Sequence, residues 1–181
     1  MVGNTLLRWG TEEQKRRFIP RILSGDDQWC QGFSEPDAGS DLARLRTVAV
    51  RDGNEWVIDG QKIWTSFAAN ANWIFVLART DPDVPKNRGI SFLLAPMDTP
   101  GIEVRPIEML TGRSEFNEVY FTDVRIPAAN IVGAVNQGWA VATSLLGHER
   151  GEEAALNPIM FRHPLDRLVT SPASTARSTT R

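Results

Sequence analysis

The spacing of apolar residues divides the chain into a helical beginning, a strand-rich middle and a helical end. Residues 11–25 predict a helix, because Thr11 and Gln14 have the spacing of a capping box and apolar residues follow on one stripe. Pro20 lies inside this helix and is expected to kink or divide it, because proline has no backbone N–H. The helix is expected to stop near Gly25.

From about residue 28 the pattern changes to short strands separated by turns. Asp52-Gly53-Asn54 and Asp59-Gly60 are turn sequences suited to hairpins. Residues 73–78 form a continuous apolar run, which is long enough only for a strand buried on both faces. Several short strands with no helix between them predict a closed or sandwiched antiparallel sheet. The predicted strands are 47–51, 55–59, 61–66, 73–78, 89–95, 102–107 and 117–123.

After the strands, a second helix is expected to begin near Gln137 or Gly138, with Trp139 and Leu145 on its apolar stripe. The pattern decays after Arg162. Residues 170–181 contain no large apolar residue, so the end of the chain is expected to be disordered. The predicted divisions of the chain are 1–27, 28–136, 137–162 and 163–181, and the last of these is the expected disordered tail.

The amino-acid composition mainly argues against certain classes of partner and of site. Of the 181 residues, 41% are hydrophobic and 23% charged, as in a soluble globular protein. A net charge of −2 without a basic stripe argues against a nucleic-acid partner. No apolar run approaches the roughly 20 residues of a membrane helix, and the first residues lack the pattern of a secretion signal, so a cytoplasmic location is expected. A single cysteine, two histidines and no C-x-x-C motif argue against a disulfide or a structural metal site.

The stretch with the most distinctive chemistry is residues 31–41. Glu35 precedes a proline and is therefore held extended, while Gly39 allows a sharp turn. Ser34, Ser40 and Asp41 add short polar side chains around that turn. By itself this stretch fits either a surface turn between two strands or a loop that binds a ligand through free N–H groups and hydroxyls.

Four ordered motifs then indicate a family. Residues 34–41, S-E-P-D-A-G-S-D, resemble the (T/S)-E-P-x-A-G-S-D signature of the acyl-CoA dehydrogenase family. Residues 60–66, G-Q-K-I-W-T-S, look like the second flavin-contacting strand of that family. Residues 98–102 and 121–127 match two further family segments in the right order. The resemblance extends over residues 11–151, and on it the chain is identified as a member of the family.

This resemblance implies an α+β fold in which an antiparallel β-barrel middle domain, residues 28–136, is flanked by terminal helices. Residues 1–27 correspond to the last helix of the N-terminal helical domain, and residues 137–162 to the first helix of a truncated C-terminal bundle. The implied activity belongs to fatty acid metabolism. It is the FAD-dependent oxidation of an acyl-CoA thioester to the trans-2-enoyl-CoA, with the α proton going to a carboxylate and the β hydride to flavin N5.

The resemblance also assigns site residues. Ser40 falls where the family contacts the CoA moiety. Trp64 would pack on the flavin ring, although a buried core position is the ordinary alternative for a tryptophan. Gln31 stands where some relatives have tyrosine. The residues assigned to the flavin are Gln31, Phe33, Ser34, Trp64, Thr65 and Ser66.

Glu149 is the candidate general base. On a helix it shares the apolar stripe of Leu145 and Leu146, and desolvation there would raise its pKa toward the range that a base needs. By resemblance, Glu149 falls where the isovaleryl and long-chain branches place their catalytic glutamate, and the neighbouring Arg150 is assigned to substrate binding. Two alternatives stay open: a structural carboxylate paired with Arg150 or a lysine, and a base supplied by the distal bundle.

The expected partners are an acyl-CoA substrate and electron-transfer flavoprotein or a similar electron acceptor, with a homo-oligomer in the full-length form. One alternative is a catalytically inactive remnant with at most weak flavin binding. Another is an acyl-CoA oxidase or flavin monooxygenase relative on the same scaffold. Both terminal helices are expected to expose an apolar face, because their bundle partners are not in this sequence.

Overall fold

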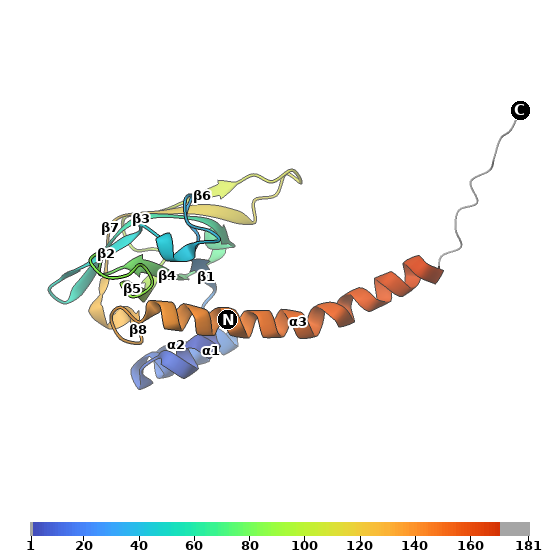
Figure 1. Cartoon of the computed structure of the whole chain (residues 1–181), viewed down its shortest axis with the longest axis horizontal. Helices are drawn as coiled ribbons and strands as arrows, with labels where there is room; N and C mark the ends of the chain where they lie inside the picture. The colour runs from blue at the N-terminus through green and yellow to red at the C-terminus, as the bar shows by residue number, and fades with distance from the viewer. Residues whose placement is uncertain (1, 171–181) are drawn as a thin grey trace, which may run out of the picture. The chain divides into compact units, whose positions relative to one another are not determined.

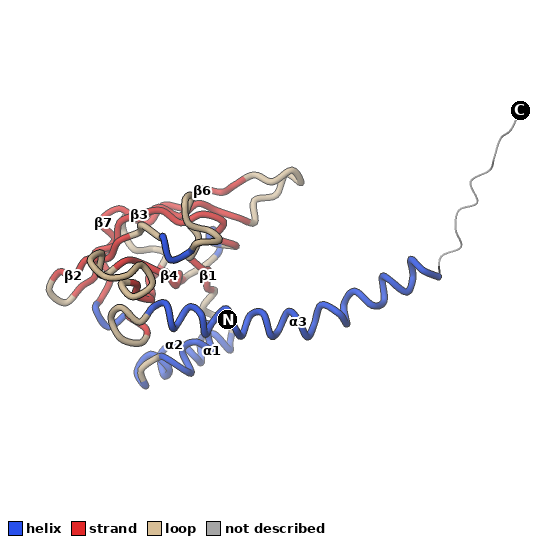
Figure 2. Tube along the Cα trace, viewed as in Figure 1, coloured by secondary structure: helices blue, strands red, loops and turns tan. Residues whose placement is uncertain are grey.

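The structure is a computed structural model that describes residues 2–170 (Figure 1). The chain divides into two compact units, Met1–Leu145 and Leu146–Arg181. Figure 2 shows helices at both ends of the described chain and strands between them, which confirms the α+β class.

The first unit begins with two helices, α1 (Val2–Trp9) and α2 (Glu12–Ser24). The capping box of α2 is confirmed, because Gln14 N donates to Thr11 Oγ1 and Thr11 N donates to Gln14 Oε1. Pro20 lies inside α2, which continues through it as one helix of 13 residues. The left-handed conformation of Gly25 ends the helix where the sequence predicted.

In the part of the chain that the structure describes, eight strands form one sheet in the order β6-β7-β3-β2-β4-β5-β8, and β1 pairs with β4 beside this path. Short 3₁₀ helices lie at Leu42–Arg44, Ala68–Asn70 and Ala128–Asn130. The strands are β1 (Trp29–Gly32), β2 (Val48–Asp52), β3 (Glu55–Ser66), β4 (Trp73–Arg79), β5 (Ile90–Pro96), β6 (Ile102–Ile107), β7 (Phe116–Pro127) and β8 (Ile131–Val132).

The prediction of a closed antiparallel barrel is not confirmed. The sheet is mixed, because β1 pairs with β4 in parallel and β2 meets β4 in parallel through Val48 and Arg79. Within the described residues the strand path ends at β6 and at β8 without joining them. Hydrophobic spacing indicates which residues of a strand are buried, but it does not indicate which strands are neighbours. The parallel pairing of β4 could therefore not be predicted from this spacing.

Strand β3 also differs from the prediction, which was of two strands joined by a turn at Asp59-Gly60. The strand is continuous from Glu55 to Ser66, and its pairing with β7 shifts register between Ile58 and Gly60. The extra residue at this shift belongs to β7, between Phe121 and Val124, and Gly60 itself pairs with Phe121. A Cβ atom on Gly60 would lie 2.5 Å from Thr47 Oγ1, so only glycine fits this close approach. The predicted hairpin at residues 52–54 is confirmed by the antiparallel pairing of β2 with β3.

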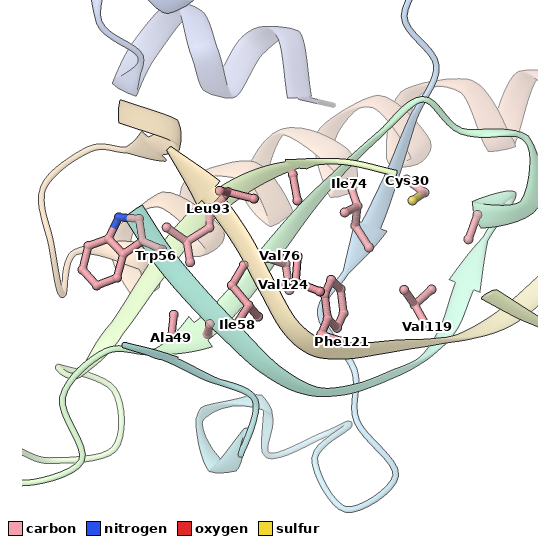
Figure 3. Close-up of a cluster of buried hydrophobic side chains, with 14 residues drawn as sticks. Cys30, Ala49, Trp56, Ile58, Ile74, Val76, Leu93, Val119, Phe121 and Val124 are labelled. Carbon is pink, nitrogen blue, oxygen red and sulfur yellow. The ribbon is translucent and has the colours of Figure 1, made fainter. Parts of the chain in front are cut away.

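The core of the first unit lies between the strands (Figure 3). The prediction that residues 73–78 are buried on both faces is confirmed, and β5 is buried in the same way. Figure 3 shows Ile58, Val76, Phe121 and Val124 pointing toward one another from β3, β4 and β7. This packing fixes the strands from which the candidate site is built.

Helix α3 (Gly138–Thr170) begins where the sequence predicted and enters the second unit at Leu146. It continues past Arg162, so residues 163–170 are helical rather than disordered. Residues 171–181, also assigned to the disordered tail, lie outside the described residues. The second unit exposes several large apolar side chains, including Ile159, Phe161 and Leu168. Among the described residues, no helix is both long and apolar enough to cross a membrane.

Candidate functional site

A buried ion pair joins the first two motifs. The ammonium of Lys62, on β3, donates to Glu35 Oε1 at 2.8 Å and to the carbonyl of Phe33 at 3.2 Å. Glu35 lies in the segment between β1 and β2, residues 33–47, which we call the motif loop. The two side chains are 0% and 6% exposed, so this pair is screened from water.

The Glu35 carboxylate also holds the far end of the motif loop. The backbone N–H groups of Arg46 and Thr47 donate to its two oxygens. Burial opposes the negative charge, but the Lys62 ammonium and these N–H donors outweigh that cost and keep the pKa of Glu35 below its ordinary value. Burial lowers the pKa of Lys62 to about 8 against the attraction of Glu35. Both groups are therefore charged at neutral pH.

Near the end of β3, the motif loop accepts a backbone hydrogen bond in place of the neighbouring strand β7. The pairing of β3 with β7 passes from Lys62 opposite Val119 directly to Thr65 opposite Asn117. The two residues between, Ile63 and Trp64, therefore leave the ladder in a bulge. Ile63 N donates instead to the carbonyl of Ser34 at 2.9 Å.

This bulge turns Trp64 outward. Its φ of 61° is left-handed, which is an uncommon backbone conformation for a bulky side chain. The indole is 58% exposed and meets Phe116 edge to face, with 6.0 Å between ring centroids. Phe67, three residues on, is also left-handed and exposed. A tryptophan held in this way is available to a ligand, so the alternative of a core position for Trp64 is wrong.

Buried polar atoms near the same segment lack partners among the described residues. Thr65 is buried and its Oγ1 has no hydrogen bond, although its carbonyl accepts from Asn117 Nδ2 at 2.9 Å. On β1, Gln31 Oε1 is likewise buried and unpaired. An unpaired buried polar group costs about 1–3 kcal/mol. A ligand rich in donors and acceptors, such as a flavin ring, fits these atoms and the exposed indole.

Of two further residues predicted to bind the cofactor, Phe33 is buried and Ser66 is exposed. The ring of Phe33 packs in the core, edge to face with Phe75 and Phe92, so its side chain is not free for a ligand. Its carbonyl accepts from Lys62, as described above. Ser66 is exposed at the end of β3, opposite Phe116.

The second half of the motif loop is basic. The Arg79 guanidinium, at the end of β4, donates to the carbonyls of Ala43 and Leu45. Lys86 pairs with Asp41 at 2.7 Å on the surface. A hollow of about 390 Å³ opens here, and Ser40 is exposed on the turn that precedes it along the chain. The residues that line the hollow are Ala43, Arg44, Leu45, Arg46, Arg79, Pro82, Val84 and Lys86.

The first unit thus brings together Ser34, Trp64, Thr65 and Ser66 through the motif loop and β3. Glu149 and Arg150 belong to the second unit. Glu149 is half-buried and Arg150 is exposed. Among the described residues, no group of three or more His, Cys, Asp or Glu side chains could hold a metal ion.

The residues that the sequence interpretation missed are Glu35 and Lys62. Both lie inside the quoted motifs, but neither was assigned a role. One signal could have found them. Lys62 has the spacing of Trp56 and Ile58, whose side chains face the core, and a lysine at a buried position needs an acidic partner.

Comparison with known proteins identifies the family. Residues 30–124 match the sequence profile of the acyl-CoA dehydrogenase middle domain. Acyl-CoA dehydrogenase IpdE1 of Mycobacterium tuberculosis is 48% identical over 176 residues, which cover 97% of this chain and 46% of that protein. Acyl-CoA dehydrogenase FadE34 of the same organism is 54% identical over 146 residues, covering 81% and 20%.

A solved structure named Tcur3481-Tcur3483 steroid ACAD is 46% identical, with a TM-score of 0.86 over 93% of this chain and 44% of that one. The chain therefore spans about half the length of these relatives or less. Profile, sequence and structure agree that this chain belongs to the acyl-CoA dehydrogenase family and carries its middle domain.

Proposed function

We propose that the chain is the middle portion of an FAD-dependent acyl-CoA dehydrogenase, which converts an acyl-CoA to the trans-2-enoyl-CoA. The observation that carries this proposal is the bulged end of β3, which exposes Trp64 and leaves Thr65 Oγ1 without a partner. When bound, FAD supplies the acceptor for the β hydride. A cytoplasmic location is part of the same proposal.

The cofactor would be held from two sides. Trp64 offers an apolar face to the flavin ring, and the hydroxyls of Thr65 and Ser66 offer hydrogen bonds to its polar edge. Ser34 and Gln31 supply a hydroxyl and an amide from the start of the motif loop and from β1. Phe33 contributes through the core packing of its ring and through its backbone.

The CoA moiety would use the basic half of the motif loop. Arg44, Arg46 and Lys86 border the hollow and carry the positive charge that phosphate groups need. Ser40 adds an exposed hydroxyl on the preceding turn. Binding energy from this remote part of the substrate would orient the thioester at the flavin.

Glu149 would remove the α proton. An α C–H is a very weak acid, so the site must combine a correctly placed carboxylate with donors to the thioester oxygen. Arg150, beside it on α3, would contact the substrate. The distal-bundle base and the structural carboxylate are the outcomes that would replace this assignment.

The comparisons also support a substrate class and an assembly. The similarity to a structure named a steroid ACAD favours an acyl group that carries a ring system. The ChsE4-ChsE5 complex from Mycobacterium tuberculosis is 46% identical with a TM-score of 0.76 over 81% of this chain, which favours a multi-subunit full-length protein. Electron-transfer flavoprotein, or a carrier like it, would reoxidise the flavin.

Two experiments test the proposal. In the first, FAD is titrated into the purified chain, and quenched flavin fluorescence with a shifted visible spectrum is expected. No binding at saturating FAD would favour the inactive remnant.

The second experiment tests Glu149 in a chimera that joins residues 1–151 to the remaining C-terminal sequence of IpdE1. Glu149→Gln keeps size and hydrogen bonding but cannot accept a proton, so flavin reduction by acyl-CoA should fall by about 10²–10⁴-fold while FAD stays bound. Straight-chain, branched and steroid-derived acyl-CoA are compared by anaerobic stopped flow. A rate within about tenfold of the parent chimera would assign Glu149 a structural role. Fast reaction of the reduced flavin with oxygen would indicate an oxidase.

A further inference from the structure

We infer that Glu35 and Lys62 are positioning residues for the flavin site: their pair sets the motif loop against β3, so that Ser34 and the outward-turned Trp64 face the cofactor together. The inference rests on the proposed function for the identity of the ligand. Its structural part, the coupling of the loop to the strand, does not depend on FAD.

The contacts of the pair connect three points of the site. Glu35 binds Lys62 on β3 and the N–H groups of Arg46 and Thr47, where the loop enters β2. Lys62 also binds the carbonyl of Phe33, where the loop leaves β1. A pair with only a local stabilising role would not need partners at both ends of the loop and on the strand.

Lys62 also has a particular place in β3. It is the last residue paired with β7 before the bulge that contains Trp64. The N–H of the next residue, Ile63, pairs with Ser34 of the motif loop. The position of the loop therefore decides whether the bulge forms, and the bulge decides whether Trp64 faces outward.

Energetics supports a positioning role over a purely stabilising one. Desolvating two charges cancels most of their attraction, and well-packed neutral residues of similar size often stabilise a protein as well or better. Removing one partner is different, because it leaves a buried charge alone. A neutral replacement of both residues should therefore restore stability and isolate the loss of positioning.

The test uses Lys62→Met, Glu35→Gln and the double variant in the complete 181-residue chain. Each single variant is expected to unfold at lower urea concentration. The double variant should recover part of this loss, since no buried charge is left unpaired, although the glutamine amide can accept only one of the two N–H bonds that the carboxylate accepts. Lys15→Met is the matched control, because it removes the exposed pair of Lys15 with Glu12 on α2.

Two readouts decide the inference in the double variant. Hydrogen exchange at the Ile63 amide should become faster by about tenfold or more, as its partner Ser34 loses its fixed position. FAD affinity should fall by about tenfold, which corresponds to about 1.4 kcal/mol. Lys15→Met should change neither.

The outcomes separate this inference from the proposed function. A double variant that keeps wild-type exchange at Ile63 overturns the positioning role, whatever FAD does. A double variant with faster exchange but wild-type FAD affinity also overturns it, because the position of the loop would then be irrelevant to the site. If wild type itself fails to bind FAD, the proposed function fails, and the exchange rate of Ile63 still decides whether the pair positions the loop.

Discussion

Two of the three ion pairs that involve the motif loop have nearly equal lengths but very different surroundings. Lys62 and Glu35 lie 2.8 Å apart with side chains 0% and 6% exposed. Lys86 and Asp41 lie 2.7 Å apart with side chains 56% and 49% exposed. The comparison shows that distance alone says little about what a pair does. Burial decides whether the pair determines the conformation of the loop or only lies on its surface.

The largest effect is expected at the buried pair. Lys62→Met leaves the Glu35 carboxylate buried without its cation and should lower the free energy of unfolding by about 3–5 kcal/mol. Urea denaturation followed by circular dichroism measures this. A loss below about 1 kcal/mol would make the buried pair no more important for stability than an ordinary surface pair, and would contradict the view that burial separates the two.

The pH dependence sharpens the comparison with a smaller effect. Burial lowers the pKa of Lys62 to about 8, against 10.5 for an ordinary lysine, while Glu35 is the ionisable group that faces it. Between these pH values the unfolded chain binds more protons than the folded one, so stability rises with pH. Wild type should therefore gain stability relative to Lys62→Met from about pH 8 to 10.5. Parallel denaturation midpoints of the two proteins over this range would contradict the lowered pKa.

The smallest effect is expected at the surface pair. Asp41→Asn keeps the size of the side chain and removes its charge, so the free energy of unfolding should change by only about 0–1 kcal/mol. Added salt should reduce even that difference, because water and ions screen the exposed pair. Denaturation of both proteins at low and high salt checks this. A salt-independent loss as large as that of Lys62→Met would show that burial does not separate the two pairs.

The sequence predicted the local features of the fold and missed those that depend on distant neighbours. The capping box of α2, the turn at Asp52-Gly53-Asn54 and the start of α3 at Gly138 were predicted, because each depends on residues close in the chain. The parallel neighbours of β4 were missed, because strand order is set by the packing of remote segments. No turn forms at Gly60, because β3 continues along β7 with only a shift in register.

In the candidate site, too, local features were predicted and contacts between distant residues were missed. The two motifs indicated the segments around Ser34 and Trp64, and the structure brings them together. The connection between them was missed, because Glu35 and Lys62 are 27 residues apart and only the folded sheet makes them neighbours. Glu149 lies in the second unit, and its role as the base stays a prediction.

The most direct test of the proposed flavin site is the FAD affinity of Thr65→Val. The substitution keeps the shape of the side chain and removes only a buried hydroxyl that has no partner in the structure. Stability should therefore stay the same or rise by about 1 kcal/mol, while FAD should bind about tenfold more weakly, because the hydroxyl would lose its bond to the cofactor. A flavin fluorescence titration beside wild type measures this. An FAD affinity equal to that of wild type in a stably folded Thr65→Val would contradict the assignment of the β3 end as the flavin site.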